Sequence, residues 1–119
     1  MSLLLVTLAG ALGCLFRFLI EYAFRRHHPT IRPWGTVVAN ALGCFIAAYV
    51  VFNLSLTISP RWHDVLTTGF CGGLTTFSSA FAIPAILMKE HAKKYAIALV
   101  TTTPLACALA YALGAALPR

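Results

Sequence analysis

The residues best suited to chemistry lie in one run, Gly69 to Ser79, in the middle of a long apolar segment. Two adjacent glycines, Gly72 and Gly73, precede four hydroxyl residues within five positions. Glycine costs about 1 kcal/mol in a helix interior, and hydroxyl side chains compete for backbone hydrogen bonds. We therefore predict a break in the helix near Gly72 to Thr76.

Such a break would supply two kinds of ligand group. Irregular backbone within a membrane is tolerated only where it is buried in protein or lines a cavity. Its free carbonyl groups can hold a cation, and its amide ends can face an anion. The alternative is close helix packing through the glycines, with the hydroxyl groups bonded to the preceding turn. The residues by themselves leave both interpretations open.

Asn40 and Arg17 are polar residues in otherwise apolar surroundings. The Asn40 amide could hydrogen-bond between helices, or it could donate to a passing ion. Arg17 could draw anions into a vestibule, because a charge inside the membrane is a functional candidate. It could instead extend to the interface or pair with Glu21, four residues later.

Phe77 and Phe81 lie one helical turn apart, beyond the first hydroxyl residues. The edge of an aromatic ring carries the positive part of its quadrupole and could contact a small anion. Helix packing is the alternative role. No serine, histidine and acid share a motif, and the three acids all lie near predicted membrane edges. The sequence therefore predicts that the protein is not an enzyme.

Membrane helices must position these residues. The 119-residue chain is 60% hydrophobic and 10% charged, and its mean hydropathy is +0.83, whereas soluble domains carry about 25% charged residues. A helix needs about 20 apolar residues to cross the hydrocarbon core. We predict an all-α, multi-pass protein of the cell membrane, with one domain (1–119) and four transmembrane helices. The expected spans are 3–24, 34–56, 64–88 and 95–117.

Small residues recur every four positions on three of the expected helices, which favours close approach of helix backbones. They are Ala9 and Gly13; Gly35, Ala39, Gly43 and Ala47; and Ala106, Ala110 and Gly114. The pattern does not say whether the contacts lie within one chain or between chains. Because four helices leave little room for a pathway shielded from lipid, we also expect at least a dimer.

The four cysteines and the charged residues indicate neither a metal ion nor a nucleic acid as a ligand. The cysteines fall one to a span without metal-ligand spacing, which is typical of packing residues: Cys14, Cys44, Cys71 and Cys107. The net charge of +6 resides mainly in short loops, so we expect no nucleic-acid partner. One side has Arg25, Arg26, Arg32, Lys89, Lys93 and Lys94, and the other has Arg61 and Arg119. This bias predicts one fixed orientation, with both termini outside.

Three segments resemble the signatures of one family, the CrcB/Fluc fluoride channels. Gly72-Gly73-Leu74-Thr75-Thr76-Phe77-Ser78 resembles the helix-three signature. Gly35-Thr36-Val37-Val38-Ala39-Asn40-Ala41-Leu42-Gly43 resembles the helix-two signature, and Gly10-Ala11-Leu12-Gly13-Cys14-Leu15-Phe16-Arg17 resembles the helix-one signature. The three segments stand in family order, at family spacing, and cover helices one to three.

The resemblance implies an antiparallel, dual-topology dimer that exports cytoplasmic fluoride passively through narrow pores at the dimer interface. It implies a central structural sodium ion on the backbone carbonyls of Gly72 and Thr75, supplied by both subunits. Asn40 matches the pore-lining asparagine, and Phe77 matches the first phenylalanine that contacts fluoride. Ser78 and Ser79 occupy the hydroxyl positions of the pathway. Arg17 ends the helix-one signature and is a further pathway candidate.

The chain departs from the family pattern at Ala80, where the family has its second phenylalanine. Phe81 follows one residue later, and one residue turns a helical side chain by about 100°. Thr103 could place a hydroxyl along the pore from helix four. Together with the charge bias, Ala80 suggests a heterodimer with an inverted homologue. Two alternatives are a proton-coupled transporter of the small multidrug-resistance type, which needs an embedded carboxylate, and a non-conducting assembly subunit.

Overall fold

The computed structural model describes residues 2–27 and 34–118, and these residues form four helical spans with no β-strand among them. All four spans are long and apolar enough to cross a membrane. The elements are α1 (Ser2–His27), α2 (Trp34–Tyr49), η2 (Val50–Leu54), α3 (Pro60–Asp64), η3 (Val65–Cys71), α4 (Gly72–Leu74), α5 (Phe77–Lys89) and α6 (Lys93–Ala116). The all-helical fold with four spans is therefore confirmed.

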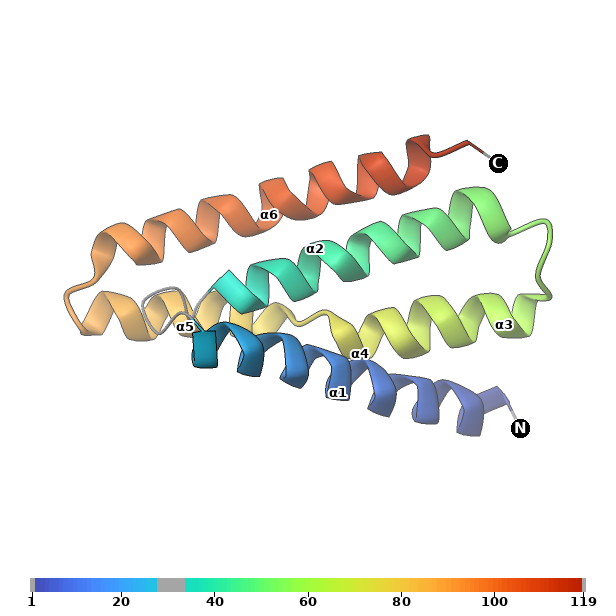
Figure 1. Ribbon diagram of the computed structural model, residues 1–119, viewed down its shortest axis with the longest axis horizontal. Helices are drawn as coiled ribbons and strands as arrows, with labels where there is room; N and C mark the ends of the chain where they lie inside the picture. The colour runs from blue at the N-terminus through green and yellow to red at the C-terminus, as the bar shows by residue number, and fades with distance from the viewer. Residues whose placement is uncertain (1, 28–33, 119) are drawn as a thin grey trace.

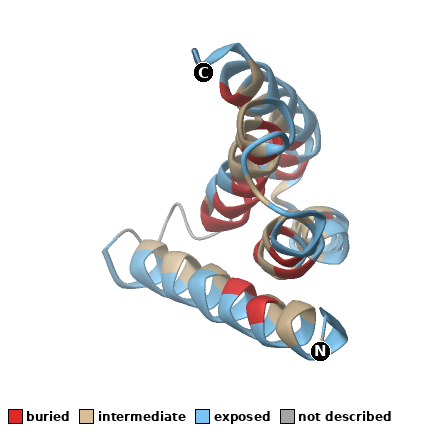
Figure 2. Ribbon diagram, turned by 90° about the vertical axis from the view of Figure 1, so that its right-hand side faces the viewer, coloured by how far each residue is buried: buried red, intermediate tan, exposed pale blue. Residues whose placement is uncertain are grey.

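Successive spans run in opposite directions (Figure 1). The second span joins α2 to η2, and the third runs continuously in sequence from α3 to α5. Helix α1 packs on η3, α4 and α2, and α6 packs on α2 and α5. The outer side of α1 is exposed and apolar (Figure 2), with Leu12 and Phe18 each at least half exposed. Because soluble monomers avoid apolar surface of this extent, the outer surface suits lipid.

Small residues allow α1 to lie directly on the third span. A Cβ atom on Gly13 would come within 2.8 Å of the Leu74 amide nitrogen and closer still to the Phe70 carbonyl oxygen. A Cβ on Gly73 would overlap the Gly10 carbonyl. The stripe on α6 behaves similarly, because Gly114 faces the Phe45 backbone of α2. The close contacts predicted from the small residues therefore form within a single chain at these positions.

Two residues of the third span are not helical. Thr75 (φ −86°, ψ 154°) and Thr76 (φ −148°, ψ 125°) are extended, and α5 begins at Phe77. The Thr76 hydroxyl accepts a hydrogen bond from the Ser79 amide at 3.4 Å, which caps α5. Gly72 and Gly73 belong to α4 and remain helical. The extended backbone thus falls on the threonines rather than on the glycines.

The basic residues gather at one end of the bundle. The end of α1 and the turn between α5 and α6 lie at the same end (Figure 1), and α3 begins at the opposite end. The first end carries Arg25, Arg26, Lys89, Lys93 and Lys94, and the second carries Arg61. The other two residues of the sequence argument, Arg32 and Arg119, lie outside the described residues.

Candidate functional site

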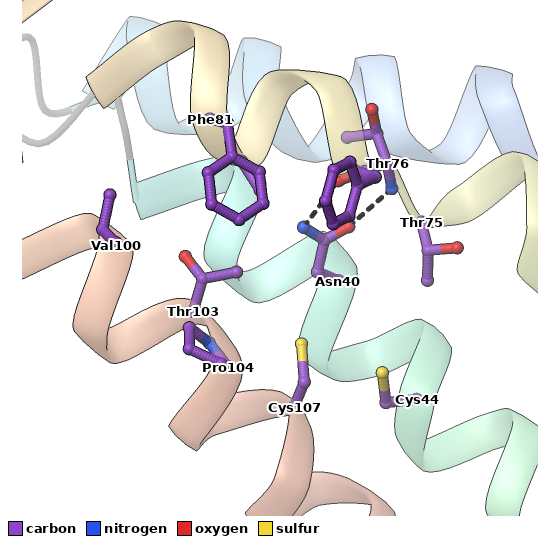
Figure 3. Close-up of a pocket in the computed structure, with 11 residues that line it drawn as sticks. Asn40, Cys44, Thr75, Thr76, Phe81, Val100, Thr103, Pro104 and Cys107 are labelled. Atoms are coloured by element: carbon purple, nitrogen blue, oxygen red, sulfur yellow. Dashed lines mark hydrogen bonds between the residues drawn. The ribbon is translucent and has the colours of Figure 1, made fainter. Parts of the chain in front are cut away.

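A pocket of about 350 Å³ lies between α2, α5 and α6, beside the two extended threonines (Figure 3). Its lining is uncharged and mostly apolar. The lining residues are Asn40, Cys44, Thr75, Thr76, Phe77, Ala80, Phe81, Val100, Thr103, Pro104 and Cys107. Since it collects most of the polar and aromatic residues singled out in the sequence, this pocket is the candidate site.

The Asn40 side chain holds the extended segment in place. Its Nδ2 donates to the Thr76 carbonyl at 3.1 Å, and its Oδ1 accepts from the Thr76 amide at 2.7 Å. Asn40 is only 5% exposed, so both bonds replace contacts with water that an extended backbone would otherwise need. Of its two possible roles, bonding between helices is therefore realised. Nδ2 carries a second proton, and no hydrogen bond among the described residues uses it.

The rings of Phe77 and Phe81 form a pair on the side of the pocket contributed by α5. Their centroids are 4.6 Å apart and their planes are tilted by 44°. Both rings line the pocket, as does Ala80 between them. The spacing of four residues therefore keeps Phe81 on the same face as Phe77. Phe77 is 80% exposed, so this chain alone covers little of its ring.

Two of the three threonine hydroxyls in the pocket lining donate to backbone carbonyl groups four residues earlier in the chain. Thr103 donates to the Leu99 carbonyl at 2.7 Å, and Thr75 donates to the Cys71 carbonyl at 2.8 Å. Each hydroxyl oxygen keeps lone pairs but offers no proton in this rotamer. Asn40 is thus a better donor to an anion than either threonine.

Arg17 and Glu21 bind separate partners. Arg17 Nη1 donates to the Thr75 carbonyl at 3.5 Å, from the α1 side. The Glu21 carboxylate accepts from the Thr36 hydroxyl at 3.3 Å. No ion pair joins the two side chains in the described part of the chain, so the pairing considered from their spacing is wrong. Arg17 does not line the pocket, although it contacts the extended segment behind it.

Three other sequence candidates also lie outside the pocket. Gly72 is exposed, and a Cβ there would meet nothing within 4 Å. Ser78 is exposed, with its hydroxyl 3.2 Å from that of Thr76. Ser79 lines a narrow gap between α2, α5 and α6 rather than the pocket itself. The pocket thus unites Asn40, Thr75, Phe77, Phe81 and Thr103 and excludes Arg17, Gly72, Ser78 and Ser79.

Sequence reasoning missed two thiols in the pocket lining, Cys44 and Cys107. The spacing along the sequence could have identified them. Cys44 follows Asn40 by four residues and Cys107 follows Thr103 by four, which places each thiol on the same helix face as a site candidate. Their packing role had been inferred only from the missing metal-ligand spacing along the sequence.

Comparison with known proteins gives one consistent family. A family model described as "CrcB-like protein, Camphor Resistance (CrcB)" matches residues 4–115. A "Fluoride-specific ion channel FluC" of Leptospira interrogans (serovar copenhageni) is 42% identical over 80 residues, covering 66% of this chain and 63% of the relative. A protein of the same name from Salmonella arizonae is 42% identical over 90 residues, covering 74% of this chain and 70% of the relative. The matched part therefore spans less than two thirds of the first relative's length.

Proposed function

The chain belongs to the CrcB-like family, and we propose on this basis that it is one subunit of a fluoride-selective channel that lets cytoplasmic fluoride leave the cell. The named relatives are fluoride-specific channels, not enzymes. The four apolar spans make the chain a multi-pass membrane protein, consistent with the cell membrane. An inside-negative potential drives an anion outward by about 2.3 kcal/mol per 100 mV, so export needs no energy-coupling group.

One observation carries the proposal: an amide side chain and two aromatic rings line the same uncharged pocket. Asn40 lines the pocket with Phe77 and Phe81. A fluoride ion that has lost water requires donors that are neutral enough to release it again. The free Nδ2 proton and the positive ring edges suit that need. The ion would pass along this face of α5, where a second subunit would cover the exposed ring of Phe77.

We propose further that Thr75 and Thr76 form a break in the third span within the membrane. Their extended angles support this. The Thr76 amide bonds to Asn40, so the Gly72 carbonyl, four residues earlier, loses its usual helical donor. Gly72 faces open space beyond the chain. Free carbonyls in such a place can serve a partner subunit or an ion.

The proposed structural sodium ion fits these carbonyls if two chains meet there. Hard cations bind several oxygen atoms. One chain would offer only the carbonyls of Gly72 and Thr75, whereas two chains would offer four. Thr75 O accepts from Arg17 at 3.5 Å, and a carbonyl oxygen has a second lone pair to offer. When bound, the ion would offset the repulsion between the carbonyl oxygens of the facing subunits. The incomplete ligand set supports a dimer around this point.

The second subunit is proposed to be a homologue in inverted orientation, which gives an antiparallel heterodimer. The described charges support this, with Arg25, Arg26, Lys89, Lys93 and Lys94 at one end and Arg61 at the other. A strong bias of this kind opposes insertion in both directions. Phe81, in contrast, pairs with Phe77 in this chain, so the Ala80 departure no longer argues for a partner.

Reporter fusions at the C-terminus should therefore show a single topology. Alkaline phosphatase, which is active only outside the cytoplasm, should be active, and a fluorescent protein that folds only in the cytoplasm should stay dark. Replacing Lys93 and Lys94 with alanine should move both signals toward balance, because it removes basic residues beside a span. Equal signals from the two reporters on the unchanged chain would contradict the fixed orientation.

Truncating either ring should lower fluoride flux while sparing the fold. For Phe77→Ala and Phe81→Ala we expect a loss of roughly tenfold, the equivalent of about 1.4 kcal/mol, because each variant removes a ring edge from the pocket. The matched control is Phe52→Ala, since Phe52 also belongs to an aromatic pair, with Tyr111, away from the pocket. Thermal unfolding of the purified variants separates a loss of fluoride flux from a loss of stability. Unchanged flux in both α5 variants would instead favour a non-conducting assembly subunit.

The main competing function is proton-coupled transport of cationic drugs. That chemistry needs a carboxylate in the binding site, and the pocket lining contains no acid. Glu21 lies near the end of α1, bonded to Thr36. The neutral pocket therefore favours the channel.

A further inference from the structure

Two thiols from different helices share the pocket. Cys44 on α2 and Cys107 on α6 both line it, and both are partly exposed (Figure 3). They lie on neighbouring helices, because α2 packs on α6. Cys71 of η3 is buried and does not line the pocket, and Cys14 lies exposed on α1. The pocket therefore gives access to one pair of thiols, contributed by two helices that pack on each other.

The number of ligands decides which metal a thiol pair can hold. Zinc takes four protein ligands in structural sites and three in catalytic ones. The described residues contain no group of three histidine, cysteine or acidic side chains that could hold a metal ion. Two thiolates are enough for soft d¹⁰ cations, which accept linear two-coordinate sites and prefer sulfur ligands.

The net charge of the metal–thiolate complex favours a divalent metal ion. A charged complex is expensive to bury at membrane depth. A divalent cation with two thiolates is neutral, whereas a monovalent cation with two thiolates is not. In the binding step, both S–H bonds break, two sulfur–metal bonds form and two protons leave for water through the pocket. No oxidant or reductant is needed.

We propose that Cys44 and Cys107 form a two-thiolate site for a soft divalent cation such as mercury(II), and that the bound metal ties α2 to α6 and obstructs the pocket. Asn40 precedes Cys44 by one helical turn, and Thr103 precedes Cys107 by one turn. The metal therefore lies about one turn from both groups. Obstruction of flux rests on the proposed channel function, whereas metal binding does not.

Metal retention tests the binding site directly. Purified protein is exposed to mercury(II) chloride and then washed with glutathione, which removes metal held by a single thiol. We expect retention of about one mercury per chain, with X-ray absorption giving two sulfur neighbours. Retention should be lost in Cys44→Ala and in Cys107→Ala, and kept in Cys14→Ala, the matched control on α1. Zinc under the same wash should not be retained.

Two outcomes of this experiment overturn the site. One is unchanged retention in Cys44→Ala, and the other is unchanged retention in Cys107→Ala; in the second case, loss of retention in Cys71→Ala would identify the pair as Cys44 and Cys71. Protein that elutes as a monodisperse species, with thermal unfolding like that of the unchanged chain, ensures that a negative result does not come from misfolding.

Fluoride flux with and without mercury(II) tests the obstruction. Within each variant the two conditions are compared, so differences in basal flux do not matter. The unchanged chain should lose most of its flux and recover it with a dithiol, and Cys44→Ala and Cys107→Ala should lose little. Retained metal with unaffected flux would overturn the obstruction. Absence of flux both from the chain alone and from the chain together with an inverted partner would contradict the channel function, and the retention result would still decide the site.

Discussion

Replacing Asn40 with aspartate should nearly abolish fluoride flux and leave most of the fold intact. The new carboxylate can still accept from the Thr76 amide, as Oδ1 does now at 2.7 Å. It can no longer donate to the Thr76 carbonyl, a bond of 3.1 Å in the unchanged chain. It also faces a permeating anion with a negative charge. At 4 Å and an effective dielectric constant of 20, two unit charges repel by about 4 kcal/mol, or roughly a thousandfold in occupancy.

Flux through reconstituted liposomes measures the effect, and two further variants locate its cause. Asn40→Ala removes both bonds to Thr76 without adding charge, so it should lower stability by about 1–3 kcal/mol and flux less than the aspartate does. Asn53→Asp is the matched control, because Asn53 Nδ2 donates to the Gly114 carbonyl at 3.2 Å, outside the pocket. Near-normal flux in Asn40→Asp would remove Asn40 from the pathway.

Gly73→Ala should destabilise the fold strongly, whereas the adjacent Gly72→Ala should not. A Cβ on Gly73 would overlap the Gly10 carbonyl oxygen and lie 2.9 Å from its carbon. Because the obstacle is backbone, α1 would have to separate from the third span. Overpacking typically costs about 1–3 kcal/mol, and a clash between backbones belongs at the upper end of that range. A Cβ on Gly72 meets nothing within 4 Å of this chain.

The pair of variants therefore separates the fold from the assembly. Thermal unfolding in detergent should show a large loss for Gly73→Ala and little change for Gly72→Ala. If a second subunit covers Gly72 as proposed, Gly72→Ala should weaken dimer formation and flux in an otherwise folded chain. Wild-type dimerisation and flux in Gly72→Ala would place the subunit interface elsewhere. Normal unfolding of Gly73→Ala would contradict the close contact of α1 with α4.

The four spans could be predicted from the sequence because hydropathy and charge placement decide them locally. A close contact of α1 with another helix was also predictable, since Gly13 and Ala9 mark a face on which a backbone can approach, but the pattern did not identify the third span as the partner. The sequence was less able to predict which residues of the third span are extended. Gly73 lies against the Gly10 backbone and remains helical, and the Asn40 amide bonds to the extended Thr76.

The pocket itself could not be derived from one helix at a time. Phe81 appeared rotated away from the expected position, but its ring lies against Phe77 because residues four apart share a helix face. The Cys44–Cys107 pair depends on the relative register of α2 and α6, which no pattern within either helix determines. The partner of Arg17 likewise depends on packing, since Arg17 on α1 reaches the carbonyl of the extended Thr75 in the third span.

Fluoride efflux from liposomes tests the central claim most directly. The chain is reconstituted alone, and together with a copy in which the basic residues at the two ends are exchanged to invert it. A fluoride electrode records release after valinomycin is added, which lets potassium leave with the anion so that no opposing membrane potential stops the efflux. The account predicts rapid fluoride efflux from the mixed subunits, slower efflux from the chain alone, and no comparable release of chloride. Efflux no faster than from protein-free liposomes in both samples, with folded protein present, would contradict it.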